Sequence, residues 1–143
     1  MRELLFLESA RRFGDCSLLL LRVVVGSFLI WGVWDNIISL ERMQEFIGFL
    51  TKFGFPAPEW MAPLSVAAQF IVGVCFVVGL FTRWAGVLCM INFLVAIAMV
   101  DRFAGVRGAF ASMCLVLIGL YLATYGAGRY SIDRHLTSRT DNR

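Results

Sequence analysis

A few polar side chains interrupt the long apolar stretches of this sequence, and they are its strongest candidates for chemistry. Arg22 and Asn36 lie in and just after the first stretch, Gln69 lies inside "AAQFIVG", and Asn92 lies inside "MINFLV". A centrally placed arginine costs about 2.5 to 3.5 kcal/mol on membrane-insertion scales, so it needs a partner or a purpose. A cavity with one cationic donor, two amides and otherwise apolar walls would suit a carbonyl-bearing lipophilic molecule, such as a quinone.

The helical period places small residues on the same faces as these polar groups. At 100° per residue, Arg22, Gly26 and Asn36 share one stripe, and Gln69 and Gly73 share another. Small residues beside polar ones either let two helices approach closely or leave room for a ligand, and the sequence leaves both open. The predicted ligand-binding residues are Arg22, Gly26, Asn36, Gln69, Gly73 and Asn92.

A purely structural role for these groups is the competing interpretation. Gln69 and Asn92 can bond to each other across two antiparallel helices, and such a bond is worth about 0.6 to 2 kcal/mol. Arg22 lies six residues beyond Cys16, which is roughly 9 Å along a helix. Its side chain could therefore snorkel to the membrane surface or fix the packing of helices.

Combinations of residues that catalyse reactions or hold metals do not occur in the sequence. There is no Cys-x-x-Cys pair, no Ser/His/Asp or Cys/His arrangement, and no glycine-rich phosphate loop, and the single histidine, His135, lies in the tail. We predict no catalytic residue, no metal site and no autonomous enzyme. The cysteines are expected to act as small apolar residues, and they are Cys16, Cys75, Cys89 and Cys114.

Three uncharged runs are long enough to cross a membrane, because about 20 helical residues span the hydrocarbon core. Residues 60–82, 84–100 and 108–128 form runs of 23, 17 and 21 residues, and 16–34 qualifies apart from Arg22. The sequence therefore predicts an all-α, integral membrane four-helix bundle that forms a single domain over residues 1–143. The predicted spans are about 16–34, 60–81, 84–100 and 108–126.

The connection after the first predicted span has the pattern of an amphipathic helix. Over about 39–53, apolar residues recur at three- and four-residue spacing with charged residues between them. Ser39 fits an N-cap, and Gly54 fits a stop signal. This segment is too short to span, so we expect it at the membrane interface, either as a strut or as a lid over a pocket.

The charged residues next to the spans are expected to be solvated. We expect Asp35 to face water or to pair with Arg42, and we expect Asp101 to lie in an exposed loop with Arg102 and Arg107. The side of the membrane shared by both termini carries eight Lys and Arg residues, against four on the other side. Because cytoplasmic loops carry the excess, both termini should be cytoplasmic. This topology accounts for the formal charge of +3 and indicates no nucleic-acid partner.

Four segments, taken in order, resemble the DoxX family of small four-helix membrane proteins. They are "LLRVVVGSFLIWG" at 20–32, "GFPAPEWMAPL" at 54–64, "QFIVGVCFVVGLFTRWAGVLCMINFLVA" at 69–96 and "GAGRYSIDR" at 126–134. The resemblance covers about residues 16–136, and "GFPAP" and "GLFTR" are its most specific parts.

This resemblance implies a multi-pass protein of the bacterial inner membrane. Members of the family are linked to thiosulfate:quinone oxidoreductase, to thiol and oxidative-stress complexes, and to chaperoning of receptors or cargo. Many members have a glutamate at the position of Gln69 and a histidine near the position of Trp31. At the first of these positions, this chain has a neutral amide in place of a carboxylate.

The favoured hypothesis is a membrane subunit or small-molecule binding module that binds a quinone and supports redox partners, as an accessory subunit of a quinone-linked oxidoreductase would. Its expected partners are membrane lipid and either another protein or a second copy of the chain. The alternative is a structural or chaperone-like protein that recruits another protein and binds no small molecule. A small transporter is a third interpretation, and it would need two copies because one four-helix bundle encloses little space.

Overall fold

The computed structural model describes residues 13–140, and within that range the chain forms helices and no strand. Four of the basic residues counted on the side of the termini lie outside the described residues, namely Arg2, Arg11, Arg12 and Arg143. The elements in chain order are α2 (Gly14–Ile38), α3 (Leu40–Lys52), α4 (Pro58–Val78), α5 (Thr82–Met99), the 3-10 helix η2 (Asp101–Phe103), α6 (Gly105–Tyr125) and α7 (Ile132–Thr140).

The predicted fold class is confirmed. Four helices, α2, α4, α5 and α6, are long and apolar enough to cross a membrane. The amphipathic helix α3 separates the first two of them, and the side chain of Ser39 accepts a hydrogen bond from the backbone N–H of Arg42, as expected of an N-cap. The tail after α6 forms a further helix, α7.

The four long helices pack most closely as two pairs, α2 with α4 and α5 with α6. In the first pair, a Cβ atom added to Gly26 would lie 2.6 Å from the carbonyl oxygen of Gly73. In the second pair, a Cβ atom added to Gly86 would lie 2.6 Å from the carbonyl oxygen of Gly119. Glycine is therefore what allows the backbones to come so close in each pair.

Apolar side chains cover much of the outer surface of the helices. The core contains residues from all four long helices, including Leu29, Phe76, Cys89 and Leu122. Many equally apolar side chains are exposed, among them Leu20, Trp31, Trp60, Trp84, Phe110 and Leu117. A chain with this outer surface is solvated by lipid, which is the environment that the hydropathy of its spans also requires.

The tail fastens the turn that joins α4 to α5, residues 79–81, and we call this part of the molecule the turn end. Gly79 and Phe81 have positive φ values of 74° and 50°. The carboxylate of Asp133 accepts hydrogen bonds from the backbone N–H groups of Phe81 and Thr82 at 2.7 and 2.9 Å. The tail thus satisfies N–H groups that the first turn of α5 leaves free.

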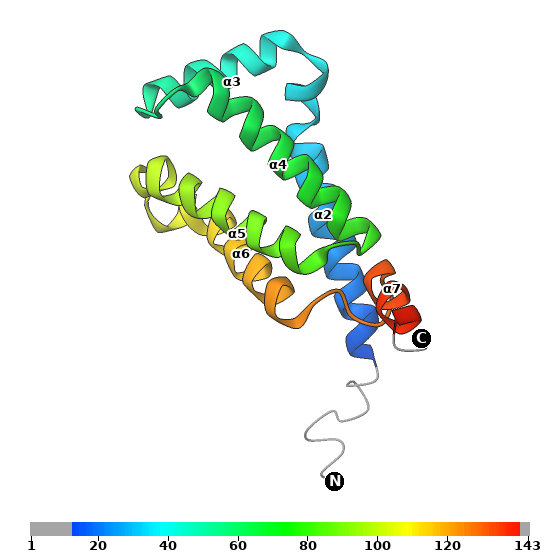
Figure 1. Cartoon of the computed structure of the whole chain (residues 1–143). Helices are drawn as coiled ribbons and strands as arrows, with labels where there is room; N and C mark the ends of the chain where they lie inside the picture. Colours follow the sequence, from blue (N-terminus) through cyan, green and yellow to red (C-terminus); the bar gives the residue numbers. More distant parts are fainter. Residues whose placement is uncertain (1–12, 141–143) are drawn as a thin grey trace.

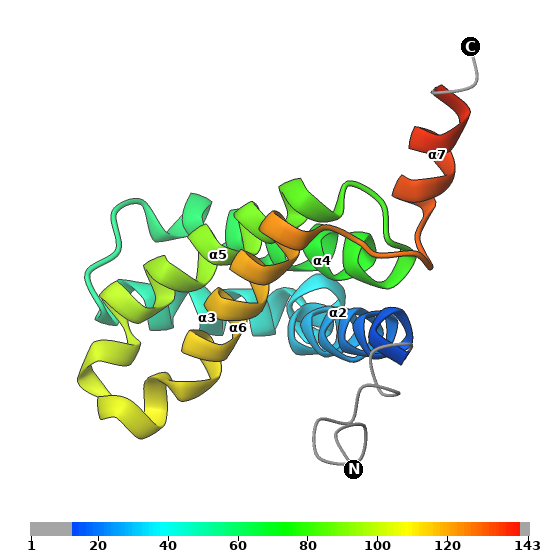
Figure 2. The ribbon, with the colours of Figure 1, turned by 90° about the horizontal axis from the view of Figure 1, so that it is seen from below.

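From the turn end, α4 and α5 diverge, so the two helix pairs stand apart at the far end (Figure 1). That far end carries α3 and η2, and we call it the α3 end. The helix α7 projects from the opposite end, near the start of α2 (Figures 1 and 2). The divergence of α4 from α5 is what makes room for the site described next.

Candidate ligand cavity between α4 and α5

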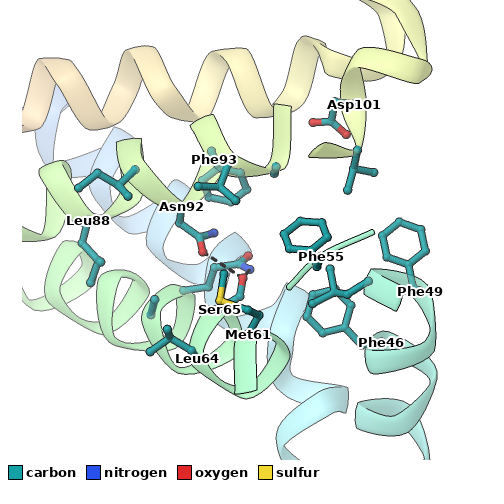
Figure 3. Close-up of a pocket in the computed structure, with 17 residues that line it drawn as sticks. Phe46, Phe49, Phe55, Met61, Leu64, Ser65, Leu88, Asn92, Phe93 and Asp101 are labelled. Carbon is teal, nitrogen blue, oxygen red and sulfur yellow. Dashed lines mark hydrogen bonds between the residues drawn. The ribbon is translucent and has the colours of Figure 1, made fainter. Parts of the chain in front are cut away.

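A cavity of about 440 Å³ lies between α4 and α5 at the α3 end. Most of its wall is apolar, and Figure 3 shows side chains from α3, α4 and α5 facing it. Its lining residues are Phe46, Phe49, Leu50, Phe55, Met61, Leu64, Ser65, Ala68, Gln69, Leu88, Ile91, Asn92, Phe93, Val95, Ala96, Val100 and Asp101. The volume is within the range of small-molecule sites, which is about 300 to 1,000 Å³.

Three polar side chains form a chain of hydrogen bonds on the cavity wall. The amide nitrogen Nε2 of Gln69 donates to the hydroxyl of Ser65 over 3.3 Å, and this hydroxyl donates to Oδ1 of Asn92 over 3.0 Å. We call these residues the amide cluster. Gln69 and Asn92 therefore come together, as expected for two antiparallel helices joined by a tight turn, but through Ser65 and not directly.

The direction of these hydrogen bonds leaves a donor for a ligand. Asn92 accepts through Oδ1, so its Nδ2 amide group carries the two N–H bonds. Within residues 13–136, no acceptor for that group is found, and the residue is only partly buried on the cavity wall. An N–H that points into an apolar cavity is suited to a carbonyl oxygen of a ligand.

The amphipathic helix α3 forms part of the cavity wall at the α3 end. Phe46, Phe49 and Leu50 of α3 belong to the lining. The ring of Phe53 lies 4.8 Å from that of Phe49 and 6.1 Å from that of Phe103 in η2, measured between centroids. Aromatic contacts thus join the end of α3 to η2, and this geometry agrees with the lid interpretation of the amphipathic segment.

Arg22 lies at the turn end, away from the cavity wall. Its side chain is 1% exposed. Its Nε donates to the carbonyl oxygen of Phe76 at 3.0 Å, and its Nη1 donates to the carbonyl oxygens of Ala127 and Tyr130. Arg22 therefore binds the last turn of α4 and the segment after α6, and its guanidinium is occupied by backbone acceptors.

Three other predicted site residues also lie away from the cavity wall. Gly26 and Gly73 form the close contact between α2 and α4 and do not line the cavity. Asn36 lines a shallow hollow beside α3 together with Asp35 and Arg42. Of the predicted ligand-binding residues, only Gln69 and Asn92 lie on the cavity wall.

The structure decides one expectation about charged residues and corrects another. Asp35 is exposed, which is the first of its two expected environments, and Arg42 pairs instead with Glu45 at 2.9 Å, one helical turn away on α3. The hydrogen bond and the negative charge of Glu45 raise the pKa of Arg42 above its ordinary value. Asp101 is not in an exposed loop, since η2 folds it back onto the cavity wall.

The predicted ligand-binding residues did not include Ser65, Asp101 or the phenylalanines of α3. Ser65 precedes Gln69 by one helical turn, so the helical period places it on the same stripe as Gln69 and Gly73. No comparable signal existed for Asp101, because its position depends on the path of the chain after α5. Phe46 and Phe49 belong to the apolar stripe of the amphipathic helix, and the sequence does not say what that stripe covers.

The described residues contain no group of three or more His, Cys, Asp and Glu side chains that could hold a metal ion. The cysteines Cys16, Cys75, Cys89 and Cys114 are free, so no disulfide joins them. The chemistry available at the cavity is therefore hydrogen bonding, one carboxylate and apolar contact.

Comparison with known proteins identifies the family. The family model DoxX matches residues 17–102, which is more than half of the chain. The chain belongs to the DoxX family. This confirms the resemblance inferred from the sequence segments. The matched region of this DoxX protein runs from α2 to η2 and contains the whole cavity lining, from Phe46 to Asp101.

A relative has a comparable length. The uncharacterized membrane protein Rv3486 of Mycobacterium tuberculosis is 27% identical over 147 residues, and the aligned part is 88% of this chain and 85% of that protein. No solved structure matches the chain. The relative supports the assignment of this DoxX protein to a membrane, and it carries no information about a ligand.

Proposed function

We propose that this DoxX-family protein binds a lipophilic, carbonyl-bearing molecule of the quinone type in the cavity between α4 and α5, and that it thereby supports redox partners in the membrane. The amide cluster on the wall of an otherwise apolar cavity carries this proposal. Nδ2 of Asn92 donates to a ligand carbonyl, and the apolar walls of α4 and α5 contact the ring and the tail.

The first experiment asks whether a ligand is present. The full chain is purified in a mild detergent, the bound lipids are extracted, and mass spectrometry quantifies quinone per protein. A stoichiometric quinone supports the proposal. A protein partner recovered in stoichiometric amount without any quinone would favour the structural or chaperone-like alternative.

The second experiment tests the cavity residues. Asn92→Leu and Gln69→Leu should each weaken the binding of a short-chain quinone such as decylubiquinone by about 2- to 10-fold, because one neutral hydrogen bond is worth about 0.5 to 1.5 kcal/mol. Binding is measured by titration of the protein in lipid nanodiscs, with empty nanodiscs subtracted.

Asn36→Leu is the matched control, because it removes the same amide from a residue outside the cavity. It should leave the affinity unchanged. If all three variants bind the quinone as the wild type does, the amide cluster is not the ligand site.

We further propose that the protein lies in the bacterial inner membrane with both termini in the cytoplasm, from the excess of basic residues on the side of the termini. A green fluorescent protein fused to the C-terminus should fluoresce in cells, whereas alkaline phosphatase at the same position should be inactive. The opposite pattern would reverse the orientation. We also propose that the protein either binds another protein or forms a homo-oligomer in the membrane.

A further inference from the structure

The proposed quinone site does not use the carboxylate of Asp101. Among the described residues that line the cavity, Asp101 is the only one with a formal charge. Its Oδ2 atom is buried and has no hydrogen-bond partner within the described part of the chain. A buried carboxylate oxygen without a donor is costly, and a bound group that supplies a positive charge or a proton donor removes that cost.

Neighbouring basic groups do not supply that charge. The guanidinium of Arg102 lies 4.6 Å from the centre of the Phe103 ring, stacked over its face. Arg42, on the neighbouring helix α3, is paired with Glu45. No ion pair of Asp101 is found within residues 13–136, so the cavity has a net negative charge inside a largely apolar wall.

Aromatic rings surround this part of the cavity. Phe46, Phe49, Phe55 and Phe93 belong to the lining, and Figure 3 shows Phe55 and Phe93 in the region between Asp101 and the pair formed by Ser65 and Asn92. The face of a phenyl ring attracts a cation, and a carboxylate with aromatic rings is a common combination for binding an ammonium group.

We propose that the η2 side of the cavity binds the protonated amine of an amphiphile, with the ammonium group on Asp101 and the apolar part between α4 and α5. Asn92 lies within α5, whereas Asp101 lies beyond the end of α5 in η2, and Figure 3 shows the two side chains in different parts of the cavity. The amine site is therefore separate from the amide cluster. It shares the cavity with the quinone-like ligand but does not depend on that ligand.

The test uses two small probes that differ in charge. 4-Phenylbutylamine is fully protonated at pH 7, because alkylamines titrate near 10.4, and 4-phenylbutanol is its neutral analogue. Equilibrium dialysis against the full chain in nanodiscs, with empty nanodiscs subtracted, gives both affinities. The wild type should bind the amine about tenfold more tightly than the alcohol, since a hydrogen bond to a charged group is stronger than a neutral one.

Asp101→Asn should lower the affinity for the amine about tenfold and leave that for the alcohol unchanged. Asp35→Asn is the matched control, because it removes an exposed carboxylate outside the cavity, and it should bind both probes like the wild type. Equal affinity of the wild type for amine and alcohol overturns the proposal without any variant, as does amine binding that Asp101→Asn leaves intact.

Gln69→Leu separates this proposal from the quinone site. It should weaken quinone binding and keep the preference for the amine. If the wild type binds no quinone but still prefers the amine to the alcohol, the proposed quinone function is wrong and the amine site stands. If the wild type binds quinone but shows no preference for the amine, the amine site is wrong and the proposed function stands.

Discussion

The partners of Arg22 explain why so costly a residue lies inside a membrane helix. A guanidinium has five N–H donors, and the Nε and Nη1 groups of Arg22 donate to carbonyl oxygens on α4 and on the segment after α6. The carbonyl of Phe76 is one of the last in α4, where the helix provides no partner of its own. Arg22 thus stabilises a helix end and a chain reversal together.

Replacing this arginine should destabilise the protein. Arg22→Leu leaves buried carbonyl oxygens without donors, and we expect a loss of about 2 to 5 kcal/mol in the free energy of unfolding. The measurement is reversible unfolding in mixed detergent micelles, followed by circular dichroism.

Arg107→Leu is the control, because Arg107 is exposed at the start of α6, and it should change the stability by less than about 0.5 kcal/mol. Equal effects of the two substitutions would show that the contacts of Arg22 contribute little.

At the scale of the elements, glycine sets the distance between the helices of each pair. Gly26 and Gly32 lie on the same helix, but only Gly26 faces another backbone, since a Cβ atom on Gly32 would meet nothing within 4 Å. A glycine-to-alanine substitution at each position therefore distinguishes the effect of helix packing on stability from the effect of helix propensity.

Gly26→Ala should destabilise the protein by about 1 to 3 kcal/mol, because overpacking forces α2 away from α4. Gly32→Ala should be neutral or stabilising by up to about 1 kcal/mol, because alanine is the better helix former. Both are measured by the same unfolding assay. A Gly26→Ala protein as stable as Gly32→Ala would contradict the close contact.

The elements also show how far the sequence alone could lead. The apolar runs predicted the four long helices, and the stripe of α3 predicted the interfacial helix, because hydropathy and helical period are local properties. The proximity of Gln69 and Asn92 followed from the tight turn. The insertion of Ser65 between them depends on the tilt of α4 against α5, which no local pattern encodes.

Contacts between distant parts of the chain set the limit of prediction. The acceptors of Arg22 on Ala127 and Tyr130 are 105 and 108 residues away in the sequence, so the sequence left ligand binding and packing equally open for this residue. The position of Asp101 just after a span predicts a loop residue, whereas η2 returns it to the cavity wall.

At the scale of the whole molecule, the tail joins the two helix pairs. The segment after α6 meets Arg22 from α2 and, through Asp133, the start of α5. The backbone N–H of Asp133 also donates to the carbonyl oxygen of Gly79 at 3.0 Å. The pairs are thus held together at the turn end by a part of the chain that follows the last of the four candidate spans.

Truncation should reveal this role. A chain that ends at Tyr125 loses every one of these contacts and should unfold at a markedly lower temperature than the full chain, by more than 10 °C, since several hydrogen bonds of about 1 kcal/mol are lost at once. A chain that ends at Leu136 keeps them and should melt within about 2 °C of the full chain. Equal melting temperatures of the two truncated chains would show that the contacts of the tail do not stabilise the fold.

The separation of the turn end from the cavity has a consequence for how this molecule can change over evolutionary time. Mutations that alter the wall between α4 and α5 leave the anchoring bonds of Arg22 and Asp133 intact. We therefore expect that exchanges of a few wall residues change the shape and polarity of the cavity, while the contacts that hold the helix pairs together at the turn end are kept.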